Sequence, residues 1–164
     1  MAVKHNLIFY MILKLIIFFC LNFAALGIGG LLIGNPATNE FYQNVNKAPW
    51  TPPGWVFGAA WTTIMICFSI FMYQASTKFT FAELKMFYIL FAIQWLLNVL
   101  WNPVFFKFHF VLAGLIIIIL LTALVFWFLY FGLKNVGTSG LFVLPYFIWL
   151  LIATSLNAYI YFKN

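Results

Sequence analysis

The sequence predicts an all-α integral membrane protein in which one domain contains five transmembrane helices. Of the 164 residues, 66% are hydrophobic and only 6% are charged, and the mean hydropathy is +1.08. A soluble domain typically has about 25% charged residues, so this chain cannot build a surface that faces water. Backbone polar groups in lipid must pair within the protein, which permits helices or closed barrels. Long apolar runs without strict alternation favour helices.

The transmembrane helices follow from the spacing of the charged residues. Five long stretches contain no charged residue: 15–39, 48–77, 86–106, 108–133 and 135–162. Each reaches the length of roughly 20 residues that a helix needs to cross a hydrocarbon core of about 30 Å. We predict helices over residues 7–33, 55–77, 83–106, 109–133 and 139–162. A single domain, residues 1–164, accounts for the whole chain.

The first predicted helix has a signal-like N-terminus but a long apolar run. Lys14 interrupts that run, which then continues to Ile33 and exceeds a typical signal-peptide core. We interpret the segment as an uncleaved span whose Lys14 side chain reaches the membrane interface. Small residues four positions apart let helix backbones approach closely, for internal packing or for a dimer. These pairs are Ala25 and Gly29, Gly30 and Gly34, and Gly54 and Gly58.

The connection after the first helix, residues 34–54, is called the first loop below. It exceeds the roughly 2–8 residues that usually join helices in a bundle, and long ordered loops are often binding elements. Its end carries Pro49, Pro52 and Pro53, which restrict the backbone and stiffen it. Trp50 and Trp55 lie where an aromatic belt is expected at the membrane interface. They belong either to that belt or to a binding element.

Three of the predicted helices present polar or aromatic residues on one face. The third carries Gln94, Asn98 and Asn102 at four-residue intervals, and such amides either bond neighbouring helices or face a cavity. Trp61 on the second helix and Trp149 on the fifth also lie among aromatic residues. Aromatic stripes commonly serve packing. Three inner faces with indoles and amides could also enclose a flat pocket that suits a large apolar ring system.

Several kinds of chemistry lack their residues in this sequence. The acidic side chains Glu40 and Glu83 lie in different connections on opposite sides of the predicted membrane, and so do His5 and His109. We therefore expect neither a catalytic carboxylate pair nor a metal site within one subunit. No charged residue lies deep in a span, which argues against ion-coupled transport. The net charge of +6 comes from scattered lysines, so nucleic-acid binding is not expected.

Three blocks of sequence follow one another along the predicted helices. The first contains Phe41-Tyr42, Lys47 and Trp50-Thr51-Pro52-Pro53-Gly54-Trp55, and it ends at Trp61. The second and third contain Leu97-Asn98, Trp101, Pro103 and Phe105-Phe106, then Pro145-Tyr146, Trp149, Ala153 and Leu156-Asn157. Over nearly its whole length the sequence resembles the translocator protein family, also called the tryptophan-rich sensory protein or peripheral benzodiazepine receptor family (TspO/MBR). Two departures are small: Lys47-Ala48-Pro49-Trp50 replaces Lys-Pro-x-Trp, and Phe41-Tyr42 replaces Trp-Tyr.

The resemblance implies a five-helix bundle, commonly a homodimer, with a pocket beneath the first loop. Members bind tetrapyrroles of the protoporphyrin IX type and aromatic drug-like ligands, and act in porphyrin sensing or transport. The resemblance further implies that no cofactor is required and that porphyrin is the ligand. By matched position the resemblance implies these ligand-binding residues: Tyr42, Trp50, Trp61, Asn98, Trp101, Trp149, Ala153 and Asn157.

Two alternatives to a binding protein remain open. Some bacterial members promote light-dependent breakdown of porphyrin, which would make Trp61 and Trp149 the catalytic candidates of an enzyme. The other alternative is a structural membrane protein without a specific ligand. The sterol-recognition pattern of animal members is matched only loosely by Leu156, Tyr159 and Lys163, so we do not expect sterol binding.

The basic residues and the overall composition predict the orientation and the membrane. Five lysines lie on the N-terminal side, Lys4, Lys14, Lys78, Lys85 and Lys134, and three lie on the other, Lys47, Lys107 and Lys163. This difference favours an N-terminus inside the cell. Lys without Arg fits an AT-rich bacterial genome, so we expect a bacterial cell membrane. A mitochondrial outer membrane is the eukaryotic counterpart in this family.

Overall fold

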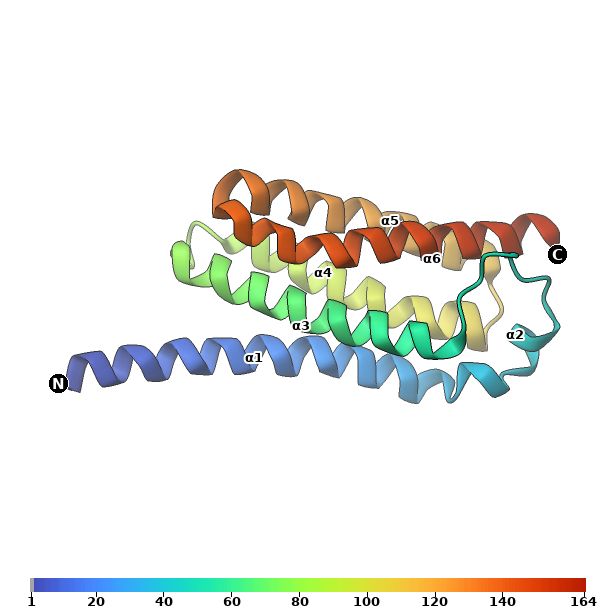
Figure 1. Cartoon of the computed structure of the whole chain (residues 1–164), viewed down its shortest axis with the longest axis horizontal. Coiled ribbons are helices and arrows are strands. Elements are labelled where there is room, and N and C mark those ends of the chain that lie inside the picture. The colour runs from blue at the N-terminus through green and yellow to red at the C-terminus, as the bar shows by residue number, and fades with distance from the viewer. Residues whose placement is uncertain (1) are drawn as a thin grey trace.

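The computed structural model describes residues 2–164, with side chains for residues 8–36 and 38–164. The side chains of His5 and Lys4, which entered the predictions above, lie outside this described part. Five long helices and one short helix form the fold: α1 (Ala2–Ile33), α2 (Glu40–Asn44), α3 (Gly54–Lys78), α4 (Lys85–Asn102), α5 (Val111–Phe131) and α6 (Leu144–Lys163). All regular structure in residues 2–164 is helical, and the long helices lie side by side in a bundle (Figure 1).

The long helices are apolar enough to cross a membrane. Four continuous helical stretches qualify: Ile8–Ile33, Gly54–Lys78, Lys85–Lys107 and Val111–Lys163. The last has 53 residues, far more than one crossing needs, and contains α5 and α6, which fold back on each other (Figure 1). The predicted all-α membrane bundle of five transmembrane helices is thereby confirmed, and the chain is an integral membrane protein.

The helices pack in a defined order around the bundle. α5 packs against α6 and α4, while α1 packs mainly against α3 and α4. The N-terminal part of α1 extends beyond the other helices, and the two ends of the chain lie at opposite ends of the bundle (Figure 1). This arrangement is expected for an odd number of spans.

Aromatic rings fill the half of the bundle near the α3–α4 connection. Phe68 lies at the centre, with its ring centroid 5.4 Å from that of Tyr146 and 5.5 Å from that of Phe128. The ring centroids of Phe87 and Phe128 lie 5.1 Å apart, and Phe71 is completely buried. Edge-to-face contacts of this kind each stabilise a core by about 0.5–1.5 kcal/mol beyond area burial. These ring contacts hold the helices together in this half of the bundle.

Polar side chains inside the bundle pair across helices. The Asn22 amide on α1 donates to the Ser69 hydroxyl on α3 at 2.9 Å, and both residues are buried. The Gln94 amide on α4 donates to the Tyr146 hydroxyl on α6 at 2.7 Å. Lys14, on α1, donates from Nζ to the carbonyl oxygen of Ser76 near the end of α3. Such bonds fix the helix register where no water can compete.

The ends of two helices differ from the predicted ranges for a physical reason. α4 ends at Asn102 because Pro103 has no amide hydrogen, and a π-helical turn over Pro103–Lys107 follows. α6 begins at Leu144 rather than at 139, because a 3-10 segment over Gly137–Val143 precedes it. Within that segment Gly140 packs directly on the backbone of Gly132 and Leu133. The hydrophobic periodicity of the sequence does not reveal this backbone crossing, in which the segment of Gly140 lies directly against that of Gly132 and Leu133.

We predict that Gly140→Ala destabilises the protein by about 2 kcal/mol or more, because a Cβ at Gly140 would overlap backbone atoms that cannot rotate away. Gly27→Ala, in α1, is the matched control, since nothing lies within 4 Å of its Cβ position. Unfolding of both variants in detergent, followed by circular dichroism, measures the difference. Equal stability of the two variants would contradict the backbone crossing.

Candidate functional site

The half of the bundle next to the first loop contains a cavity of about 850 Å³. This volume lies in the upper part of the range of about 300–1,000 Å³ for small-molecule sites. Every long helix contributes to its lining: Ala25, Leu26, Gly30 and Ile33 from α1, Trp61 from α3, Asn98 from α4, Ile118 from α5 and Trp149 from α6. The cavity therefore lies between the long helices, where the aromatic core ends.

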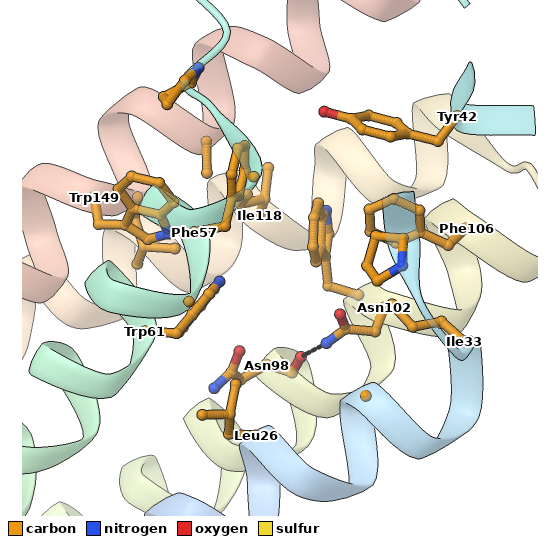
Figure 2. A pocket seen from close by; sticks show the side chains of 18 of the residues that line it. Leu26, Ile33, Tyr42, Phe57, Trp61, Asn98, Asn102, Phe106, Ile118 and Trp149 are labelled. Carbon is orange, nitrogen blue, oxygen red and sulfur yellow. Dashed lines mark hydrogen bonds between the residues drawn. The ribbon is translucent and has the colours of Figure 1, made fainter. Parts of the chain in front are cut away.

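One wall of the cavity consists of aromatic rings from α3 and α6. Phe57, Trp61 and Trp149 lie together on one side in Figure 2, facing Ile33 and Phe106 on the other. The Phe57 and Trp149 rings meet edge to face at 5.2 Å. Trp149 is only 6% exposed, so packing fixes its ring.

The wall opposite contains Trp101, which two contacts hold in place. Its ring stacks on Phe105 at 5.4 Å with an interplanar angle of 11°. Its indole N–H donates to the Oδ1 atom of Asn157 at 3.2 Å, and Asn157 itself donates to the carbonyl oxygen of Val111. Asn157 is 2% exposed and is not among the residues that line the cavity. It therefore orients Trp101 from behind.

Two amides of the predicted polar stripe reach the cavity, and the third does not. Asn98 and Asn102 line it, and the Asn102 amide donates to the Asn98 carbonyl oxygen at 3.1 Å (Figure 2). Gln94, one turn earlier, is buried in the bond to Tyr146. Gly29 of α1 lies against Asn102, since a Cβ there would come within 2.7 Å of the amide nitrogen. Of the small residues that could serve internal packing or a dimer, Gly29 therefore serves packing within one chain.

The first loop forms the end of the cavity, with Tyr42, Lys47, Thr51 and Pro52 in the lining. Two contacts attach the start of the loop to the α4–α5 connection. The Asn39 amide donates to the Phe106 carbonyl oxygen at 3.1 Å, and the Phe41 ring stacks on His109 at 4.4 Å. Farther along, the Asn46 side chain donates to the carbonyl oxygen of Lys163 at the end of α6. The first loop is thus attached to the α4–α5 connection and to the end of α6.

Trp50, which the sequence suggested as a binding residue, lies outside the cavity lining. Its indole N–H donates to the Ser155 hydroxyl on α6 at 3.1 Å, and its ring meets Tyr159 edge to face at 5.4 Å. The side chain is 55% exposed. It lies outside because these two contacts hold the indole against α6. Trp50 attaches the first loop to α6.

Six of the eight residues suggested as binding residues line the cavity: Tyr42, Trp61, Asn98, Trp101, Trp149 and Ala153. The structure places the other two, Trp50 and Asn157, outside it. The lining also contains Phe57, Asn102 and residues of α1, which are not among those eight. Phe57 lies four positions before Trp61 and Asn102 four after Asn98, so helical spacing offered a signal for both.

The polar groups of the lining are mostly uncharged. Lys47 is the single charged residue among those that line the cavity. Its Nζ atom lies 4.6 Å from the centroid of the Tyr42 ring, within the range of a cation–π contact. The Tyr42 hydroxyl is neutral at physiological pH, as is usual for tyrosine, and burial raises its pKa further, so it can donate a hydrogen bond. The cavity combines aromatic walls with a few polar groups.

A comparison with protein families decides the relationship, because a profile of the TspO/MBR family matches residues 16–162. The chain belongs to this family. Among its relatives, the tryptophan-rich sensory protein of Cereibacter sphaeroides is 34% identical over 134 residues, covering 76% of this chain and 81% of the relative. Protein CrtK of Rhodobacter capsulatus is 32% identical over 146 residues, covering 85% of this chain and 88% of the relative.

An archaeal relative shows the same extent of similarity. The tryptophan-rich protein TspO of Archaeoglobus fulgidus is 33% identical over 140 residues, covering 85% of this chain and 90% of the relative. The family profile, over residues 16–162, includes the parts of the helices that line the cavity. The family resemblance inferred from the three sequence blocks is confirmed.

We predict that Asn157→Leu lowers the free energy of unfolding of this TspO/MBR protein by about 1–3 kcal/mol. The substitution leaves the partly buried Trp101 N–H without its acceptor. Denaturation in mixed detergent measures the loss, and Thr63→Val is the control, because that exposed hydroxyl bonds only to its own helix. A double-mutant cycle with Trp101→Phe should show coupling, and strictly additive effects would contradict the assigned bond.

Proposed function

We propose that this protein binds tetrapyrroles of the protoporphyrin type in the cavity and acts in their sensing or transport. The observation that carries the proposal is the placement of three indoles, Trp61, Trp101 and Trp149, around one space that is large enough for a small-molecule ligand. Membership of a family that includes a tryptophan-rich sensory protein supports it. The ligand is inferred from the shape and chemistry of the site.

The lining suits a flat ring system better than a compact or strongly polar ligand. Phe57, Trp61 and Trp149 offer aromatic surface on one wall, and ring contacts stabilise bound aromatic groups by about 0.5–1.5 kcal/mol each. Asn98 and Asn102 place amide groups beside that surface, where they can orient polar atoms of the ligand. Binding of this kind needs neither a metal nor an acid–base pair.

The family resemblance also implies a homodimer, and we propose that the protein forms one. We also propose a bacterial cell membrane as the location, since two of the relatives named above are bacterial.

We predict that Trp61→Phe and Trp149→Phe each raise the Kd for protoporphyrin IX by about two- to tenfold, because each removes part of one ring contact. Porphyrin absorbance during titration in neutral detergent measures the Kd. Trp127→Phe is the matched control, since Trp127 packs on Phe128 and Phe131 in the filled half of the bundle. Trp50→Phe should also have little effect.

Two results of this titration would contradict the proposal. If both cavity variants bind as tightly as Trp127→Phe, the porphyrin does not occupy the cavity. If the unmodified protein binds no porphyrin beyond the amount in detergent alone, the structural alternative without a specific ligand is favoured.

Illumination separates the binding protein from the enzyme alternative. We predict that bound porphyrin keeps its absorbance in the dark, and that in light it bleaches no faster in the unmodified protein than in Trp61→Phe and Trp149→Phe. Faster bleaching that both variants abolish and Trp127→Phe retains would establish the light-dependent enzyme instead.

A further inference from the structure

The cavity has an asymmetric distribution of charge, because its one charged lining residue lies in the first loop. Lys47 is exposed, whereas Trp149, Asn98 and Ala153 of the same lining are buried. The ammonium group therefore lies at the rim of the cavity, and the Trp149 indole lies deeper. A ligand that carries one apolar part and one negative group matches this arrangement.

The ammonium group of Lys47 is available to such a ligand. The chain has only two acidic side chains, Glu40 and Glu83. Glu83 accepts hydrogen bonds from Thr80 in the α3–α4 connection, at the far end of the bundle. Among the described side chains, the contact of Lys47 is with the Tyr42 ring, and no carboxylate forms an ion pair with it.

A second donor lies beside the ammonium group. The Tyr42 ring is 4.6 Å from Lys47 Nζ, and its hydroxyl projects into the space between the two walls of the cavity (Figure 2). A tyrosine hydroxyl is protonated at physiological pH, and burial raises its pKa further, so this group can donate to an anion. A carboxylate has two oxygens and can accept from both groups at once.

We propose that Lys47 and the Tyr42 hydroxyl bind a carboxylate of the ligand at the rim, so that the cavity selects flat apolar ligands that carry an acid group. The inference rests on the proposed function, since it assigns a subsite within the same cavity. The rim position has a physical advantage. A carboxylate and an ammonium there keep part of their hydration, so the pair avoids the desolvation cost of a buried ion pair.

The proposal is tested by comparing protoporphyrin IX, which carries two propionate groups, with its dimethyl ester, which keeps the ring but has no negative charge. In neutral detergent, Lys47→Met should raise the Kd for the acid about fivefold and leave the Kd for the ester unchanged. Tyr42→Phe, which keeps the ring under the ammonium, should raise the Kd for the acid about twofold or more. Added salt should weaken the binding of the acid and leave the binding of the ester unchanged.

Lys107→Met is the matched control, because it removes a lysine of the α4–α5 connection that does not line the cavity. Equal losses in Lys47→Met and Lys107→Met, equal losses for acid and ester, or no loss at all would overturn the subsite. Tight binding of both ligands with no effect of Lys47→Met refutes this inference and leaves the proposed function standing. Failure of both ligands to bind the unmodified protein refutes the proposed function itself.

Discussion

Polar groups inside a lipid bilayer must find partners within the protein, and this constraint organises the whole bundle. Helices satisfy their own backbones, so the remaining task falls on a few side chains. Asn22 pairs with Ser69 and Gln94 pairs with Tyr146, each across two helices. These bonds fix the helices in one register, and the aromatic core near the α3–α4 connection forms around them.

The cavity exists because the same constraint is met differently in the other half of the bundle. There the amide of Asn157 orients Trp101 rather than filling space, and Asn102 bonds the backbone of its own helix. The first loop, rather than further side-chain packing, closes this end of the bundle. Asn39 attaches the loop to the α4–α5 connection, and Trp50 attaches it to α6. The result is a space with fixed aromatic walls, and rigid walls reduce the cost of ordering a site when a flat ligand binds.

Much of this arrangement could be predicted from the sequence, because helical period and charge spacing act locally. The uncharged stretches located the five helices, and spacing placed Trp61, Asn98 and Trp149 on inner faces. Trp50 escaped prediction because a loop residue has no period to set its direction. Asn157 lies on the correct helix, but which amides face the cavity depends on neighbours such as Trp101. The crossing at Gly140 depends equally on contacts between segments distant from any motif.

The central claim is that a flat apolar ligand binds in the cavity, against the indoles of Trp61 and Trp149, beneath the first loop. A crystal structure of the protein with protoporphyrin IX tests this claim most directly. It should show the ring system within the cavity, in contact with both indoles, while Trp50 remains against Ser155 outside it. A porphyrin bound on the lipid-facing surface, with the cavity unfilled, would contradict the account.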